Sequence, residues 1–371
     1  MATITIQGET GTTVVTAQAG ESLAALLRNR GLLDQPCGVG KCGKCLIYVD
    51  TKPCAEELRL LGASAVASGL RLACYTKVVD GMVVTLPRKS VLRVLTAYAS
   101  MEYAFSPRIS KTQVTLPPPN LDDQRSDVRR LLDARPGARE NLTFAQLASL
   151  PALVRSETLF ALYDEEDNTL VGVSGEAAHY GLIVDIGTTT VAALMLDLDT
   201  RRVVASRGEH NAEAPFGADV ISRIQQSMEQ GVAPLQQAIV RQIDELCASL
   251  CTECGCTDVS LISITGNTTM LHLLCGLPAT NISRAPFIPV TTEAMRCNAA
   301  VLGLHSQATT FLLPGISAYI GADTVASLLA AAGHTTGERP FLLVDFGTNA
   351  ETVLFANGTY YACSAAAGPC F

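Results

Sequence analysis

The chain has 371 residues, enough for two or three domains, and its net charge of −8 argues against a nucleic-acid partner. Thirteen cysteines in a chain without an export signal indicate a reducing compartment and metal ligation rather than disulfides. The first residues lack the basic and apolar regions of a signal peptide, and no run of about 18 apolar residues occurs, so the sequence predicts a cytoplasmic protein without a membrane span.

Residues 1–88 show the pattern of a small β-grasp domain. Alternating apolar residues predict strands, and leucines at i, i+3 and i+4 after Ser22 predict a helix that ends at Gly31. The expected elements are strands over residues 3–6, 12–17, 46–49 and 82–86 and a helix over 22–31.

Four cysteines within this domain, Cys37, Cys42, Cys45 and Cys74, have the C-x4-C-x2-C…C spacing of a plant-type [2Fe–2S] cluster. Glycines between the first three let the backbone wrap closely around the cluster. The alternatives are a zinc site or scattered structural thiols. Zinc sites usually pair C-x2-C with a second close pair, whereas Cys74 stands alone, 29 residues after Cys45. Cys54 fits no ligand position and is expected to be a plain thiol.

Residues 89–178 carry no catalytic constellation and are predicted to form a connector, 89–119, and a small α+β middle domain, 120–178. The arginines of this part, Arg125, Arg129 and Arg130, are expected on a solvated face, with partner docking as the lesser option. The predicted elements are a helix over 90–103, a stiff Pro117–Pro119 stretch, a helix capped by Asn120 or Asp122, a helix over 141–154, and strands over 159–163 and 169–173.

The segment after residue 179 opens with a buried strand that ends at Asp185 and turns through Gly187, Thr188, Thr189 and Thr190 into a second strand. Gly187 allows close approach of an anion, and the threonine N–H and hydroxyl groups can donate to phosphate oxygens. Asp185 at the strand end can hold Mg²⁺ directly or through water.

The same pattern returns 160 residues later, where an apolar strand ends at Asp345 and turns at Gly347, Thr348 and Asn349. A single Asp-x-Gly-Thr hairpin is often an ordinary β-turn. Two copies at domain-sized spacing favour an internally duplicated fold. We therefore predict an actin-like (ASKHA, RNase H-like) ATPase domain over residues 179–371, in which the two hairpins grip the phosphates of ATP.

Further candidates lie between the two hairpins. A strand ends in a third turn at Gly266 and Asn267, and helices are expected to begin near Asp219 and Asp323. Asp323 can orient an attacking water, and helix capping is the alternative role for both aspartates. Cys247, Cys251, Cys254 and Cys256 are expected to be plain thiols at a helix end, with a [4Fe–4S] site as the lesser alternative.

The order of these parts resembles that of the reductive activators of corrinoid proteins (the RACE family), over essentially the whole chain. The matching stretches are the four cluster cysteines, Leu116–Asp127, Asp185–Thr190, Gly217–Arg223, Gly266–Met270, Gly321–Asp323, Asp345–Asn349 and Ala366–Pro369. The chain departs from the family at Ala350, where Gly is usual, and at Glu213, where Gln is expected. It also stops at Phe371, inside a segment that should continue, which predicts a truncated product with an incomplete second ATPase half.

The resemblance implies an ATP-dependent activator that passes an electron from a [2Fe–2S] cluster to Co(II) and so regenerates Co(I) in a corrinoid protein of a methyltransferase system. Its cofactors would be the cluster, ATP and Mg²⁺, and its partners the corrinoid protein and an upstream low-potential electron donor. Relatives in the family suggest a homodimer. Two alternatives remain open: an electron-transfer module whose ASKHA half only docks a partner, and a small-molecule kinase with a redox-sensing cluster.

Overall fold

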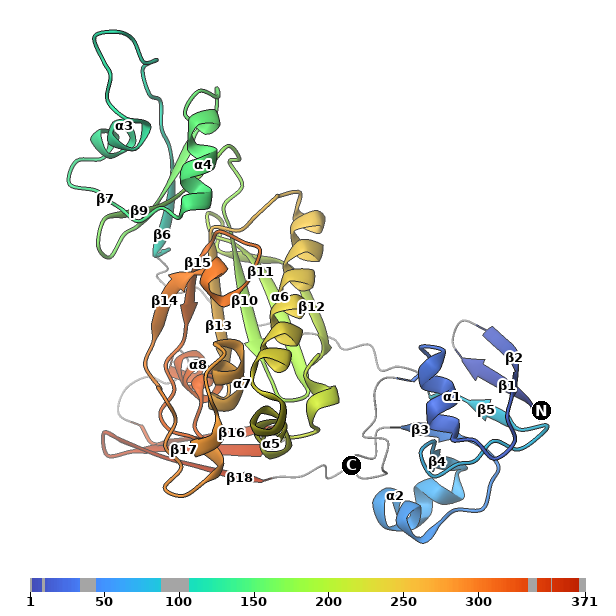
Figure 1. The fold of residues 1–371 in the computed structure, drawn as a ribbon. Coiled ribbons are helices and arrows are strands. Elements are labelled where there is room, and N and C mark those ends of the chain that lie inside the picture. The colour runs from blue at the N-terminus through green and yellow to red at the C-terminus, as the bar shows by residue number, and fades with distance from the viewer. Residues whose placement is uncertain are drawn as a thin grey trace. The chain divides into compact units, whose positions relative to one another are not determined.

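The computed structural model describes residues 2–8, 11–33, 45–87, 107–332, 339–347 and 349–366 (Figure 1). The chain divides into two compact units. One contains residues 1–92 with the short segment 214–218, and the other contains residues 93–213 and 219–371. The predicted helix over 90–103 lies outside the described residues. Within the described ranges, no helix is both long and apolar enough to cross a bilayer.

A five-stranded mixed sheet in the order β2-β1-β5-β3-β4 forms the N-terminal unit. Helix α1 begins after Ser22, as predicted, and buries Leu23, Leu26 and Leu27 against the sheet. Its elements are β1 (Ala2–Gly8), β2 (Gly11–Ala17), α1 (Leu23–Asn29), β3 (Leu46–Tyr48), α2 (Ala55–Ala67), β4 (Leu70–Leu72) and β5 (Val83–Thr85). The β1–β2 hairpin, the α1 helix and strands β3 and β5 confirm the predicted elements.

Helix α2 was not predicted. Gly62 lies inside it with φ of 77°, so the helix is kinked and its apolar periodicity is interrupted. Glu57 stabilises the segment instead, because its carboxylate accepts hydrogen bonds from the N–H of Cys54 (2.9 Å) and of Leu72 (2.8 Å). The second of these bonds ties α2 to β4.

A four-stranded sheet in the order β6-β8-β9-β7 forms the middle of the chain. Its elements are β6 (Ile109–Gln113), α3 (Asp127–Ala134), β7 (Arg139–Glu140), α4 (Phe144–Leu153), β8 (Phe160–Asp164) and β9 (Thr169–Ser174). The predicted strand pair and the second helix are confirmed. The predicted domain limits stay predictions, although β6 pairs with β8 and so favours a start of the middle domain before residue 120.

Two details of the middle sheet correct the sequence analysis. Ser126, not Asn120 or Asp122, caps α3 by accepting from the N–H of Arg129, whereas the Asn120 side chain accepts from two N–H groups in its own turn. Arg130 is buried against Asp123 rather than solvated. Its long apolar stem packs inward while the guanidinium reaches a carboxylate.

A six-stranded sheet in the order β12-β11-β10-β13-β15-β14 carries the candidate site. Strand β10 is central; it pairs with β11 in antiparallel and with β13 in parallel orientation, so the carboxyl ends of β10 and β13 lie at one edge. The strands are β10 (Tyr180–Ile186), β11 (Thr190–Asp197), β12 (Arg202–His210), β13 (Leu261–Gly266), β14 (Met295–Asn298) and β15 (Thr309–Leu312). The helices are η1 (Ala214–Phe216), α5 (Val220–Gln230), α6 (Ala233–Cys254), α7 (Thr268–Leu274), η2 (Thr280–Ser283) and η3 (Ala299–Leu302).

The last described part is a three-stranded antiparallel sheet of β16 (Phe341–Phe346), β17 (Asn349–Ala356) and β18 (Thr359–Ala366). Helix α8 (Ala322–Ala332) contacts both β13 of the large sheet and β16 of this one. The two predicted hairpins, β10–β11 and β16–β17, therefore belong to separate sheets, and α8 contacts both of these sheets (Figure 1).

Candidate functional site

The three predicted catalytic carboxylates, Asp185, Asp323 and Asp345, lie close enough together for the charges of Asp323 and Asp345 to affect the ionisation of Asp185. Asp185 stays accessible to solvent, but protein atoms crowd its carboxyl. This desolvation, and then the charges of Asp323 and Asp345, raise the pKa of Asp185 to about 6. Burial, and next the charge of Asp345, also raise the pKa of Asp323. Acidic groups from β10, α8 and β16 therefore lie around one space. Like charges so close together disfavour ionisation. Their catalytic roles stay predictions.

A fourth carboxylate, Glu351, belongs to the same group and was not predicted. It lies directly opposite Asp345 in the β16–β17 hairpin and accepts a hydrogen bond from Ser364 Oγ (2.9 Å). Burial, and next the charges of Asp323 and Asp345, raise its pKa. The signal for it lay in the hairpin itself, because a turn of known length fixes which residue faces Asp345.

The first turn is held by its glycine. The N–H of Gly187 donates to the carbonyl of Thr190 at 2.9 Å, and a Cβ at position 187 would lie only 2.8 Å from that same oxygen. Thr188 is buried and its Oγ1 accepts from Asn267 Nδ2 at 3.1 Å, whereas Thr189 is exposed. The hydroxyl of Thr188 therefore links the first turn to the third.

Two further glycines bring the third turn and α8 against this site. A Cβ at Gly266 would lie 2.7 Å from the carbonyl oxygen of Ile186, and one at Gly321 would lie 2.6 Å from Asn267 Cα. Side chains at these positions would push β13 from β10 and α8 from α7. Asn267 itself caps α7, accepting from the N–H of Met270 (3.0 Å), so its predicted part in nucleotide binding would come in addition to a capping role.

The second turn is shorter than the first. Ile186 pairs with Val191 in the first hairpin, and Phe346 pairs with Ala350 in the second, which leaves one residue fewer between the strands. The N–H of Gly347 donates to the carbonyl of Asn349 at 2.8 Å, and Thr348 lies outside the described residues. The duplication therefore holds up to the Asp-x-Gly segment and changes register at the turn.

The carboxylates around the first and second turns could hold Mg²⁺ only together with a further ligand. Within the described part of the chain, no three His, Cys, Asp or Glu side chains are close enough to hold a metal ion by themselves. Mg²⁺ usually binds one or two protein carboxylates and completes its shell with phosphate oxygens and waters. Separated carboxylates beside glycine turns suit such an ion.

Two of the four predicted cluster ligands are described. The Sγ atoms of Cys45 and Cys74 lie 3.1 Å apart, and the carbonyl of Cys45 accepts from the N–H of Ala73 at 2.8 Å. One compact group can therefore contact both sulfurs. Cys37 and Cys42 lie outside the described residues. Cys54 is the N-cap of α2.

Two cysteines, Cys251 in the last turn of α6 and Cys256 just beyond the helix, have a raised thiol pKa. A hydrogen bond with Cys247, and next burial, raise the pKa of Cys251, and burial raises the pKa of Cys256 to about 12. Metal ligation needs thiolates. Among the described residues, no group of three His, Cys, Asp or Glu side chains is placed to hold a metal ion, and the assignment of these cysteines as plain thiols stays a prediction.

Sequence comparisons match four consecutive parts of the chain. The 2Fe-2S iron-sulfur cluster binding domain matches residues 4–79, the RACo linker region 99–161, the RACo middle region 180–336, and the C-terminal domain of RACo, the ASKHA domain, 339–371. These matches confirm an N-terminal ferredoxin domain followed by ASKHA-type elements.

Two relatives extend over nearly the whole chain. The corrinoid activation enzyme RamQ of Eubacterium limosum is 25% identical over 346 residues, which are 90% of this chain and 55% of RamQ. The solved structure of a reductive activator for corrinoid, iron-sulfur protein is 27% identical and covers 99% of this chain and 63% of that one, with a TM-score of 0.62. The chain thus spans less than two thirds of the length of either relative.

Proposed function

The chain belongs to the family of reductive activators of corrinoid proteins, and we propose that it delivers single electrons to a corrinoid protein, reducing Co(II) to Co(I) in a step driven by ATP. Both relatives are named for action on corrinoid proteins. We place the protein in the cytoplasm and infer a corrinoid protein of a methyltransferase system and a low-potential electron donor as partners, with a homodimer as the expected assembly.

The electron path begins at the ferredoxin domain. Cys37, Cys42, Cys45 and Cys74 would hold a [2Fe–2S] cluster, which supplies one-electron transfer near about −400 mV in plant-type domains. The backbone contact between Ala73 and Cys45 holds the two described ligands on adjacent segments.

The nucleotide site lies at the turns of the ASKHA-type part. Asp185 and Asp345 would hold Mg²⁺ or its water, and Asp323 would orient the attacking water. The proposed phosphate contacts are Gly187, Thr188, Thr189, Thr190, Gly266, Asn267, Gly347, Thr348 and Asn349. The observation that carries this proposal is that Asp185, Asp323 and Asp345 come from three separate elements, each next to a glycine turn or a close glycine contact, and that the charges of Asp323 and Asp345 reach Asp185.

Such a site can drive an unfavourable electron transfer only through differential affinity. The nucleotide must bind one state of the complex with the corrinoid protein more tightly than another. The bound cation would also remove the mutual repulsion of the carboxylates, so the arrangement of β10, α8 and β16 differs in energy between the free and bound states.

The test is an anaerobic assay that follows Co(I) absorbance in a corrinoid protein supplied with this chain and titanium(III) citrate. ATP-dependent appearance of Co(I), lost in Asp185→Asn and retained in a surface variant such as Glu253→Gln, supports the proposal. Co(I) that forms equally without ATP favours a simple electron-transfer module and overturns the ATP-driven step. Phosphorylation of an added sugar or acid, without Co(I), favours a kinase.

A further inference from the structure

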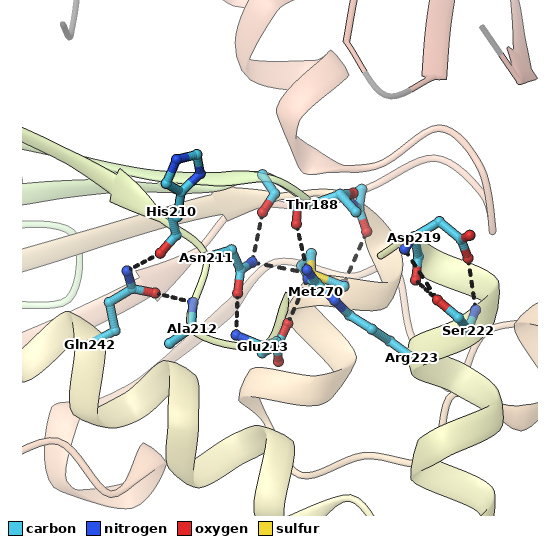
Figure 2. Close-up of polar contacts among 12 residues, drawn as sticks. Thr188, His210, Asn211, Ala212, Glu213, Asp219, Ser222, Arg223, Gln242 and Met270 are labelled. Atoms are coloured by element: carbon cyan, nitrogen blue, oxygen red, sulfur yellow. Dashed lines mark hydrogen bonds and ion pairs between the residues drawn. The ribbon is translucent and has the colours of Figure 1, made fainter. Parts of the chain in front are cut away.

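A buried polar cluster lies directly beneath the first turn (Figure 2). Arg223 of α5 and Glu213 of the β12–α5 connection are fully buried, with Nη1 and Oε2 3.1 Å apart. The other guanidinium nitrogen of Arg223, Nη2, donates to the carbonyl of Thr188 at 2.6 Å. The cluster thus joins two distant segments to the backbone of the turn.

Asn211 completes this cluster. Its Nδ2 donates to the carbonyl of Gly187 at 2.7 Å, and its Oδ1 accepts from the N–H of Glu213 at 2.8 Å. Gln242 of α6 bonds the carbonyl of His210 and the N–H of Ala212, so the segment that carries Asn211 is fixed to a long helix (Figure 2).

These contacts control where the turn points its donors. A trans peptide group is planar, with its carbonyl and N–H on opposite sides. Because Asn211 holds the carbonyl of Gly187, the N–H of Thr188 must point away from Asn211. Arg223 holds the next carbonyl, and Asn267 holds the Thr188 hydroxyl. The conformation of Thr188 is therefore set from three sides.

We infer that Asn211 and Arg223, with Arg223 held by Glu213, are positioning residues that fix the Gly187–Thr190 turn for the phosphates of a nucleotide. This inference rests on the proposed nucleotide site and adds residues that do not themselves touch the ligand. Asp219 and Ser222 cap α5 by their own mutual hydrogen bonds, so Arg223 is not needed to begin that helix.

The energetics of the pair agree with a positioning role. Burying two charges costs several kcal/mol per ion, and apolar residues of similar volume are often as stable. Glu213 Oε1 is buried without a hydrogen-bond partner among the described residues, so the pair is not fully satisfied. Packing alone would not select this pair, whereas the contact to the Thr188 carbonyl requires a donor from this position.

The experiment compares three forms of the 371-residue chain with the wild type. Arg223→Lys keeps the charge but cannot reach both Glu213 and Thr188 with a planar fork. The double variant Glu213→Leu with Arg223→Met removes the pair without leaving a buried unpaired charge. Arg130→Lys is the matched control, because Arg130 is also buried and paired with an aspartate, but lies in the middle sheet.

Two readouts separate the inference from the proposed function. Amide hydrogen exchange of the peptide that contains Gly187–Thr190 needs no nucleotide, and MgADP affinity is measured by titration calorimetry. We expect at least tenfold faster exchange in this peptide and at least tenfold weaker MgADP binding in both Arg223 variants, with Arg130→Lys unchanged.

If hydrogen exchange in the turn is as slow in both Arg223 variants as in the wild type, the inference is overturned, whether or not the MgADP affinity changes. Equal MgADP affinity in these variants also overturns it, while the nucleotide site stands. A wild type that binds no nucleotide overturns the proposed site, and the exchange measurement then decides whether the cluster orders the turn.

Discussion

Replacing Gly321 by alanine tests whether the close approach of α8 to α7 builds the site. The φ of Gly321 lies outside the left-handed region, so alanine can adopt its backbone conformation. The added Cβ, however, would lie 2.6 Å from Asn267 Cα, 2.7 Å from Thr268 N and 2.8 Å from Asp323 Oδ1. Carbon contacts prefer about 3.5–4.0 Å, so the two helix starts must separate by roughly 1 Å.

The expected cost follows from this overlap. Inserting a methyl group into a packed site costs about 1–3 kcal/mol. In a unit of this size, each kcal/mol lowers Tm by about 2–4 °C, so we expect a fall of roughly 2–12 °C. Because Asp323 follows Gly321 by two residues, the same shift should weaken MgATP binding at least tenfold.

Thermal unfolding by circular dichroism and calorimetric titration with MgATP measure both effects. Gly315→Ala is the matched control, because its Cβ would meet the carbonyl oxygen of Ile320 at 3.4 Å, an ordinary contact. If Gly321→Ala melts and binds MgATP like the wild type and this control, the contact between α7 and α8 does not position the site.

The other predictions concern charge and the cluster. In EDTA, Asp185→Asn should raise the free energy of unfolding by about 1 kcal/mol at pH 8 and not at pH 4. Because the pKa of Asp185 is raised, stability that is present below about pH 4 is lost as the pH rises through about 6, and solvent screening reduces the full effect. Equal urea midpoints of Asp185→Asn and the wild type at pH 8 would contradict this. Cys74→Ser should lose bound iron after anaerobic reconstitution while MgADP affinity is unchanged, with Cys54→Ser as the control that keeps its iron; a Cys74→Ser protein with full iron content would remove Cys74 from the ligand set.

The sequence predicted those parts of the site that follow from short-range patterns. An apolar strand that ends in Asp-x-Gly specifies both the strand and the turn, so Asp185 and Asp345 were found with their glycines. Asp323 was found because a helix start follows a glycine. These residues belong to segments whose conformation is decided within a few positions.

The residues that were missed depend on contacts between distant segments. Glu351 faces Asp345 within its own hairpin, but it joins the carboxylates of the site only because α8 brings Asp323 close to it. Asn211 and Glu213 follow an exposed strand, where polar residues are normally solvated, and their burial arises only after α5 and α6 pack over them. The kink at Gly62 similarly hid α2, because it breaks the periodicity by which helices are found.

The arrangement of the carboxylates connects stability to the proposed work of the protein. Without a cation, burial and next the charges of Asp323 and Asp345 raise the pKa of Asp185, and burial and next the charge of Asp345 raise the pKa of Asp323, so part of each shift comes from repulsion between like charges. The glycine contacts at Gly266 and Gly321 nevertheless hold their elements together. Nucleotide with Mg²⁺ would relieve this repulsion, and hydrolysis with release of phosphate would restore it. We propose that this relief of repulsion gives the nucleotide different affinities for two states of the protein, as an ATP-driven change of state requires.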